Sequence, residues 1–229
     1  PPNKLKPFIK SDFKASNIEM ENGNISYIAN GVTYKSILPG EYNIYNTLGA
    51  IAAMKAIGIE DEYIKMGLLD VVVPGRCERV GHKYNIPYDI IIDFAHTPDG
   101  LKNILETLRG FTTNRLIAVY GCGGDRDKVK REELGRIGTE LSDYAIITSD
   151  NPRDEDPMEI IKEIIAGINK TNFIAIENRT EAIKMAINMA EEGDVVVLAG
   201  KGHENYQITN EGVIHFDERE VVTEVFKSM

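Results

Sequence analysis

A chain of 229 residues, 42% of them hydrophobic, can bury one good core, or one complete domain and part of another. Its net charge of -10 disfavours duplex DNA and anionic membranes as partners, although local basic clusters can still hold phosphates, so small molecules are the expected partners. Two cysteines, Cys77 and Cys122, are too few for a disulfide framework or a zinc site. With no signal peptide or apolar run of membrane length, the sequence predicts no membrane insertion and a soluble reducing compartment, most simply the cytoplasm.

The first 40 residues are predicted to be irregular except for one hairpin, formed by residues 24–29 and 32–37 around Asn30-Gly31. Two strands alone are marginal in water. The hairpin therefore either packs on the helices that follow or ends a sheet whose earlier strands lie outside the chain. Apolar residues at helical spacing predict helices over residues 43–57 and 60–69. Asn43 and Asn46 fall in the first turn of the first helix, where free NH groups lie.

A change of pattern places a domain boundary near residue 76, after which strands alternate with helices. The continuously apolar runs 90–92 and 195–198 are typical of strands covered on both faces, so we predict a doubly wound α/β domain with a mostly parallel sheet. Residues 213–216 are expected to add an edge strand and residues from 218 a closing helix. The predicted strands are 88–93, 115–120, 143–148, 172–176 and 194–199, and the predicted helices are 98–109, 128–141, 157–168 and 179–191.

The stretch Asp150-Asn151-Pro152-Arg153 follows one of the buried strands directly. Proline does not donate to a ladder, so this loop lies at the carboxyl end of its strand, where open parallel sheets place their ligands. Arg153 is a fixed two-pronged donor suited to a carboxylate or a phosphate. The plainer interpretation is a solvated turn in which Arg153 pairs with its acidic neighbours Asp150, Asp154, Glu155 and Asp156.

Three further loops end neighbouring strands, namely residues 93–99, 121–128 and 200–204. Glycine-rich backbone lets NH groups approach an anion, and we expect Arg126, Lys128 and Lys201 to supply positive charge. Taken singly, each loop has a plain alternative: residues 121–124 can be a tight turn, and His96 and His203 ordinary polar residues without a metal partner at familiar spacing. The topology makes these loops neighbours, which favours a site for a phosphate or an amino acid and no metal site.

Six motifs, taken in their order along the chain, resemble the later part of the Mur ligases. Within that family they are most similar to the branch that adds diaminopimelate. The motifs are Leu-Pro-Gly-Glu-Tyr-Asn-Ile-Tyr-Asn (38–46), Pro-Gly-Arg (74–76), Asp-Phe-Ala-His-Thr-Pro-Asp (93–99), Gly-Cys-Gly-Gly-Asp-Arg-Asp-Lys (121–128), Asp-Asn-Pro-Arg (150–153) and Gly-Lys-Gly-His-Glu (200–204). The resemblance spans about residues 35–217 and implies that residues 1–76 end a central ATPase domain and residues 77–229 form a Rossmann-like C-terminal domain. No G-x-x-x-x-G-K-[ST] phosphate loop occurs in the 229 residues, and neither the UDP-binding domain nor the family's magnesium-supporting modified lysine is present. We therefore expect a fragment that is inactive alone.

The resemblance implies a reaction in which ATP, with Mg2+, phosphorylates the D-glutamate carboxylate of UDP-MurNAc-L-Ala-D-Glu. The amine of meso-diaminopimelate then attacks the acyl phosphate. Matched positions imply that diaminopimelate is bound by Arg126, Asp150, Asn151, Pro152, Arg153, Gly200 and Glu204, and that the nucleotide is contacted by Asn43, Asn46, Arg76, Asp93 and His96. Lysine lacks the distal carboxylate and would leave Arg153 unpaired at a cost of roughly 2 to 5 kcal/mol, which rejects it by well over tenfold.

Two other classes of function stay open on the sequence. A free-standing amino-acid-binding or regulatory module would share the fold without ligase activity. A nucleotide-dependent oxidoreductase is disfavoured because the dinucleotide-binding glycine fingerprint and its ribose-binding acid are absent. A monomer is the expected state.

Overall fold

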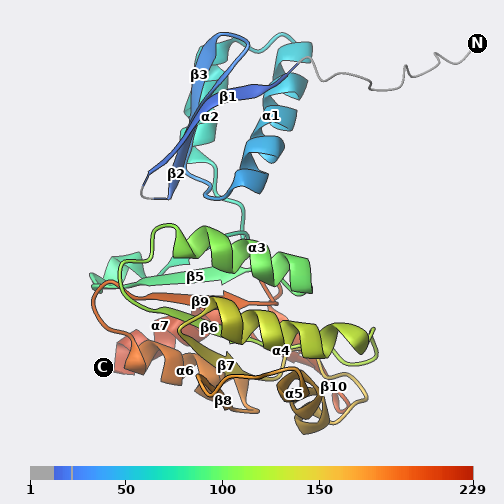
Figure 1. Cartoon of the computed structure of the whole chain (residues 1–229). Helices are drawn as coiled ribbons and strands as arrows, with labels where there is room; N and C mark the ends of the chain where they lie inside the picture. The colour runs from blue at the N-terminus through green and yellow to red at the C-terminus, as the bar shows by residue number, and fades with distance from the viewer. Residues whose placement is uncertain (1–12, 22, 229) are drawn as a thin grey trace, which may run out of the picture. The chain divides into compact units, whose positions relative to one another are not determined.

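The computed structural model describes residues 13–21 and 23–228, which form two compact units divided between Val71 and Val72 (Figure 1). The division lies slightly before the boundary predicted near residue 76. None of the helices in the described residues is long and apolar enough to cross a membrane.

The first unit is an antiparallel sheet of β1 (Ala15–Glu21), β2 (Asn24–Ala29) and β3 (Val32–Ser36), packed on α1 (Glu41–Ala56) and α2 (Asp61–Asp70). The hairpin prediction is confirmed, with Ala29 opposite Val32 across the turn. The prediction that the rest of residues 1–40 is irregular is wrong for β1, and residues 1–12 and 22 lie outside the described residues. The hairpin packs on both helices, because Tyr27 and Tyr34 share a buried cluster with Ile44, Ile51, Ile64 and Leu68.

The second unit is built on a six-stranded sheet of order β4-β5-β9-β6-β7-β8. Only β4 runs antiparallel, pairing Val80 with Ile90, so the predicted mostly parallel doubly wound sheet is confirmed. Its strands are β4 (Glu78–Val80), β5 (Asp89–Asp93), β6 (Leu116–Tyr120), β7 (Tyr144–Ile147), β8 (Phe173–Ala175) and β9 (Val195–Ala199), with a short 3-10 turn, η1 (His82–Tyr84), between β4 and β5.

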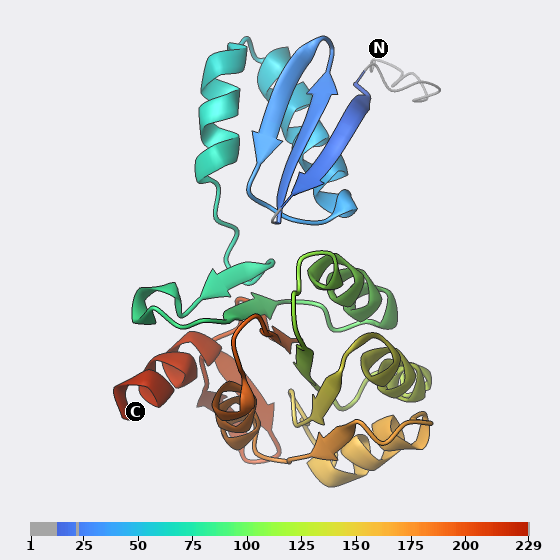
Figure 2. The same cartoon turned by 60° about the vertical axis from the view of Figure 1, so that its left-hand side comes forward.

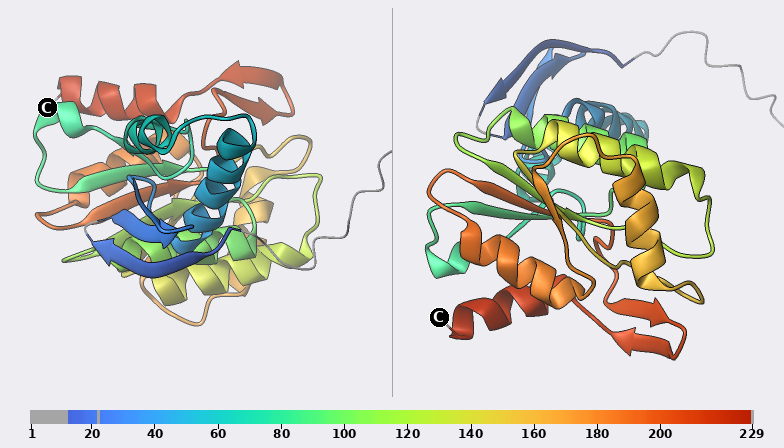
Figure 3. Two further views of the ribbon diagram at one scale, coloured as in Figure 1. Left: turned by 90° about the horizontal axis from the view of Figure 1, so that it is seen from above. Right: turned by 60° about the horizontal axis from the view of Figure 1, so that its bottom comes forward.

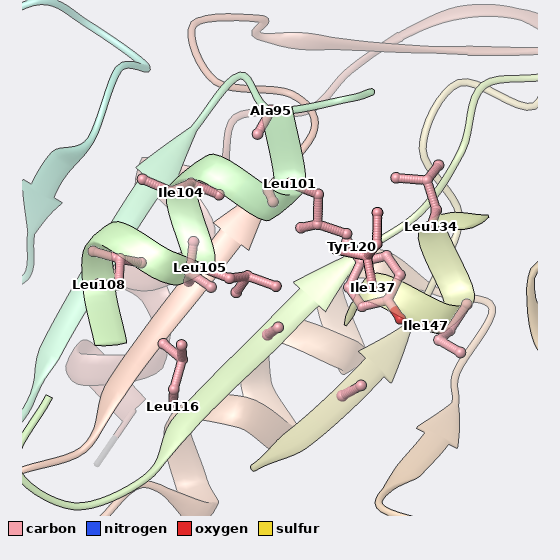
Figure 4. Close-up of a cluster of buried hydrophobic side chains, with 14 of the residues drawn as sticks. Ala95, Leu101, Ile104, Leu105, Leu108, Leu116, Tyr120, Leu134, Ile137 and Ile147 are labelled. Carbon is pink, nitrogen blue, oxygen red and sulfur yellow. The ribbon is translucent and has the colours of Figure 1, made fainter. Parts of the chain in front are cut away.

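Helices cover both faces of this sheet (Figure 2). One face carries α3 (Pro98–Arg109), α4 (Val129–Leu141) and α5 (Pro157–Ala166), and the other carries α6 (Arg179–Met189) and α7 (Glu218–Ser228). Figure 4 shows the first face, where Leu101 of α3 and Ile137 of α4 lie beside Tyr120 of β6. The central strands β6 and β9 are fully buried between the two helix layers, which explains their continuously apolar sequences.

The prediction that residues 213–216 add an edge strand to the main sheet is wrong. Residues Gly212–His215 form β11, which pairs only with β10 (Tyr206–Thr209) in a separate two-stranded sheet. This hairpin projects from the second unit in the right-hand view of Figure 3. The side chains of β11 are exposed, so no packing draws this strand onto the main sheet.

Candidate functional site

The loops that follow β5, β9, β6 and β7 meet at the carboxyl edge of the parallel sheet, as the topology predicts. They approach each other closely enough to require glycine. A Cβ on Gly124 would lie 1.9 Å from the carbonyl oxygen of Pro152, and one on Gly200 would lie 2.6 Å from Oδ2 of Asp150. The loop after β6 is therefore packed backbone against backbone on the Asp150–Arg153 stretch, and the loop after β9 is packed against the side chain of Asp150.

The guanidinium of Arg153 is held against the glycine-rich loop, residues 121–128, which follows β6. Its Nη1 donates to the carbonyl oxygens of Gly124 at 2.7 Å and Asn151 at 3.3 Å. The backbone NH of Arg153 donates to the carbonyl oxygen of Ile208 at 3.0 Å. The residue adopts a left-handed φ of 55° and lines a cavity of about 750 Å³ between the β7–α5 loop, the β8–α6 loop and the β10–β11 hairpin. It forms no ion pair with a carboxylate of the described chain, which argues against the plain acidic turn. Its Nε and Nη2 have no partner among the described residues and remain available for a two-pronged contact.

Arg126 and Arg153 both lie near Gly123. A Cβ at Gly123 would be 2.9 Å from Nη1 of Arg153 and 4.0 Å from Cγ of Arg126. Arg126 is exposed and makes no hydrogen bond or ion pair with the part of the chain that the structure describes. Two guanidinium groups are thus available at one edge of the glycine-rich loop.

Asn151 and Glu204 are joined across the sheet edge by Lys201. Nζ of Lys201 donates to Oδ1 of Asn151 at 3.1 Å and to Oε2 of Glu204 at 3.3 Å, while Nδ2 of Asn151 donates to Oε2 of Glu204 at 2.9 Å. Lys201 is fully buried, and burial lowers its pKa. The expectation that Lys201 offers its charge to a bound anion is therefore wrong. Lys128, the other lysine expected in that role, pairs instead with Glu155 at 3.0 Å.

Asp150 is buried beneath these groups, and its Oδ2 has no hydrogen-bond partner among the described residues. Beside it, Arg179 and Glu218 form an ion pair of 2.7 Å in which both side chains are fully buried. Arg179 also donates to Ser149 O at 3.3 Å and Ala199 O at 2.9 Å, which ties the ends of β7 and β9 together. Burial raises the pKa of Glu218, against the opposing effect of Arg179.

Arg131 fixes the spacing between the glycine-rich loop and the Asp150–Arg153 loop. This fully buried guanidinium donates to Oε1 of Glu155 at 2.8 Å and to Oε2 of Glu163 at 2.6 Å. Glu155 in turn accepts the NH of Asp125 at 2.6 Å. The bond from Arg131 lowers the pKa of Glu155 to about 2.

The residues expected near a nucleotide fall into two groups. Arg76 lies over the ring of Phe94 at 4.9 Å, and that ring is 4.6 Å from His96 and 5.1 Å from His203. Asp93 is buried, and its carboxylate accepts the NH groups of Cys77 at 2.7 Å and Ala95 at 2.8 Å, so both of its oxygens hold backbone.

Asn43 and Asn46 belong to the other unit. Nδ2 of Asn43 donates to Pro39 O at 2.7 Å, and Nδ2 of Asn46 donates to Oδ1 of Asn43 at 2.9 Å. Asn43 is buried, whereas Asn46 is exposed at the start of α1.

A comparison with known protein families identifies the family to which this chain belongs. Residues 75–202, which contain the strand-end loops described above, match the family model described as "Mur ligase, glutamate ligase domain". The chain belongs to the Mur ligase family. The matched segment covers β4 to β9 and all the predicted amino-acid-binding residues except Glu204.

Two relatives from clostridia share one name. The chain is 58% identical over 221 residues to a UDP-N-acetylmuramoyl-L-alanyl-D-glutamate--2,6-diaminopimelate ligase of Clostridium perfringens, a match that covers 95% of this chain and 46% of the relative. It is 52% identical over 228 residues to ligase 1 of the same name from Clostridium acetobutylicum, with 96% and 47% covered. The chain thus spans about half the length of the curated relatives that it matches.

Solved Mur ligase structures share the fold. A structure of UDP-N-acetylmuramoyl-L-alanyl-D-glutamate--2,6-diaminopimelate ligase superposes with a TM-score of 0.67 at 32% identity, over 96% of this chain and 46% of that one. The UDP-N-acetylmuramate-alanine ligase of Thermotoga maritima has a TM-score of 0.71 at 18% identity, over 96% and 46%, which shows the fold alone.

Membership of the Mur ligase family implies ATP and Mg2+ as cofactors. The described residues of this chain suit these two groups to different degrees. Within residues 13–21 and 23–228 no group of three or more His, Cys, Asp or Glu side chains is arranged to hold a metal ion. Arg76, His96 and His203 surround an aromatic ring and offer charge and hydrogen-bonding groups suited to a nucleotide.

Proposed function

We propose that this chain is the amino-acid-binding part of a ligase that joins meso-diaminopimelate to UDP-MurNAc-L-Ala-D-Glu at the expense of ATP. In this proposal residues 1–76 end the central ATP-binding domain, and residues 77–229 form the C-terminal domain that holds the amino acid. The names of the most similar relatives, at 58% and 52% identity, support the substrate pair. The ligase acts as a monomer in the cytoplasm, the compartment expected from its two unpaired cysteines.

The chemistry divides between this chain and the remainder of such a ligase. ATP, with Mg2+, activates the D-glutamate side-chain carboxylate as an acyl phosphate, and the neutral amine of diaminopimelate attacks that carbon with release of phosphate. The task of this chain is to hold the amine in place, because positioning supplies much of the rate in such transfers. Arg126, Asp150, Asn151, Pro152, Arg153, Gly200 and Glu204 are the proposed diaminopimelate-binding residues. Asn43, Asn46, Arg76, Asp93 and His96 are the proposed nucleotide contacts.

The observation that carries the proposal is the fixed guanidinium of Arg153. Its Nη1 is committed to Gly124 and Asn151, which leaves the Nε and Nη2 edge facing outward as a fork. A fork of this kind matches the distal carboxylate of diaminopimelate, which lysine lacks. Glu204, whose Oε2 is held by Asn151 and Lys201, offers Oε1 to an ammonium group, and that oxygen accepts only a long hydrogen bond of 3.5 Å from the hydroxyl of Tyr206 among the described residues.

The test compares wild-type and Arg153→Ala enzymes in the full-length protein that carries this chain. We expect Arg153→Ala to raise KM for meso-diaminopimelate about 30-fold or more and to leave KM for ATP unchanged, because the lost contact is a charge-assisted pair. Arg136→Ala is the matched control, since Arg136 is exposed and pairs only with Glu140 and Glu133 on the same helix. Phosphate release is measured with diaminopimelate and with lysine. A rise confined to KM for ATP, or equal use of lysine by the wild type, would contradict the proposal.

A further inference from the structure

The buried ammonium of Lys201 stands out because it touches two of the proposed pocket residues and faces no solvent. It lies in the loop after β9, between Gly200 at φ +123° and Gly202 at φ +56°. A side chain at either glycine would clash, with Oδ2 of Asp150 at 2.6 Å in one case and Cβ of Phe94 at 2.6 Å in the other. The two glycines let the backbone turn so that the lysine points inward.

The contacts of Lys201 leave little freedom for its neighbours. Oδ1 of Asn151 accepts from Nζ of Lys201 at 3.1 Å and from the NH of Ile208 at 3.0 Å, which fixes the orientation of the amide. The Nδ2 group of Asn151 must then face Glu204, to which it donates at 2.9 Å. Both the amide and the carboxylate are therefore oriented through one buried ammonium group.

The charge of Lys201 is balanced from several sides. Glu204 accepts its hydrogen bond, Asp150 attracts it, and Arg179 opposes it. The rings of Tyr206 and Phe216 lie 5.8 and 5.9 Å from Nζ, within the range of cation–π attraction. Without this ammonium, Asp150 and Glu204 would be two carboxylates with no cation bonded to either, and Glu204 would be held only by the neutral donors Asn151 and Tyr206 among the described residues.

We propose that Lys201 is a positioning residue that orients Asn151 and Glu204 for the amino group of the incoming amino acid. This inference rests on the proposed function, since the readout is the use of diaminopimelate. Lys201 touches no reacting group itself. It acts on the affinity for the amino acid and leaves the nucleotide contacts unaltered, because its side chain makes its hydrogen bonds and ring contacts with other residues of the described chain than Arg76, His96 and Phe94.

The experiment replaces Lys201 with methionine, which keeps the length of the side chain and removes the charge, and with glutamine, which keeps a donor. Both variants are made in the full-length ligase. Lys201→Met should raise KM for meso-diaminopimelate about 30-fold or more, Lys201→Gln should raise it less, and both should keep KM for ATP and kcat within about threefold of wild type.

The matched control is Arg115→Met at the opposite edge of the sheet. Arg115 precedes β6 and holds the buried carboxylate of Asp194 at 2.7 Å, so its loss should lower stability without changing KM for diaminopimelate. An unchanged KM for diaminopimelate in folded Lys201→Met, or equal rises for diaminopimelate and ATP, would overturn the inference. The inference would also be overturned if Lys201→Met did not fold while Lys201→Gln behaved like the wild type, because the lysine would then serve folding alone. Failure of the proposed function itself is seen separately, as a wild-type enzyme that does not use diaminopimelate.

Discussion

Replacing Arg131 with methionine should destabilise the second unit by about 2 kcal/mol. The wild-type guanidinium is fully buried and bonds both oxygens of Glu155 and one of Glu163. Its effect on Glu155 can be sized from the carboxyl pKa, which falls from 4.5 to about 2. That difference corresponds to about 3 kcal/mol of stability at neutral pH. Lys128 and the NH of Asp125 still contact Glu155 in the variant, and solvent screens the exposed side of the cluster, so about 2 kcal/mol is expected.

The assay is amide hydrogen exchange on the 229-residue chain, because it reports β6 and β7 separately from the first unit. The free energy of opening measured on these strands should fall by about 2 kcal/mol in Arg131→Met. Arg136→Met is the matched control. It removes an arginine of the same helix that is 47% exposed, and it should cost no more than about 0.5 kcal/mol.

The pH dependence follows from the sign of the Glu155 shift. A carboxyl pKa that is lower in the folded state stabilises the protein above the unfolded pKa, and this stabilisation is lost as the pH falls toward the folded value. The stability difference between wild type and Arg131→Met should therefore be constant above about pH 5 and shrink by about half by pH 3. A difference that grows on acidification, or equal losses in Arg131→Met and Arg136→Met, would refute this reasoning.

Two further predictions concern packing and titration. Gly138→Ala would place a Cβ 2.2 Å from the buried ring of Tyr120, so it should lower the free energy of unfolding in urea by about 2 kcal/mol. The Cβ of Gly49→Ala would have nothing within 4 Å, so this change should stabilise its helix by about 0.5 to 1 kcal/mol. Similar effects of the two changes would argue against the packing of α4 on β6. The bond to Glu220 raises the pKa of His215, so this pair stabilises the hairpin below the ordinary value of 6.5 and the stabilisation is lost as the pH rises through the raised value. Glu220→Gln should return the pKa of His215 toward 6.5 in an NMR titration, and an unchanged value would show that the bond does not form in solution.

Local signals predicted most element boundaries of the second unit. Thr97 caps α3 by accepting the NH of Gly100, and Asp156 caps α5 by accepting two NH groups, each just before a proline, so these helices begin where the sequence places them. Strands without buried side chains gave no such signal. The residues of β1 are exposed except for its first, which removes the alternation that marks a half-buried strand, and β4 is only three residues long.

The residues of the candidate site divide in the same way. Arg153, Asn151 and Glu204 stand in contiguous motifs at strand ends, so topology alone brings them to one edge of the sheet. The buried, paired roles of Lys201 and Arg179 were not predicted, because their partners include residues remote in sequence. Asn151 lies 50 residues before Lys201, and Glu218 lies 39 residues after Arg179.

A sequence signal for another buried cation does exist. Arg131 is spaced three, four and seven residues before Leu134, Gly135 and Gly138, so it shares their buried helical face. An arginine in that position has to bring acidic partners with it, since an unpaired buried charge is too costly. Two of the acidic residues in the nearby loop and helix, Glu155 and Glu163, fulfil that requirement.

The arrangement separates recognition from support. Three of the groups proposed to meet the amino acid, Arg126, Arg153 and Glu204, keep some contact with solvent. Asp150 and Asn151 are buried, and so are the supporting cations Lys201 and Arg179. Exposed charges at a pocket are weakly held when solvated, and the loss of side-chain freedom on binding then reduces affinity. Holding Glu204 by the buried ammonium of Lys201, and Arg153 by backbone carbonyl oxygens, places that cost in folding, before the amino acid arrives. Substrate preference in this domain should therefore respond to substitutions such as those at Lys201 that never touch the substrate.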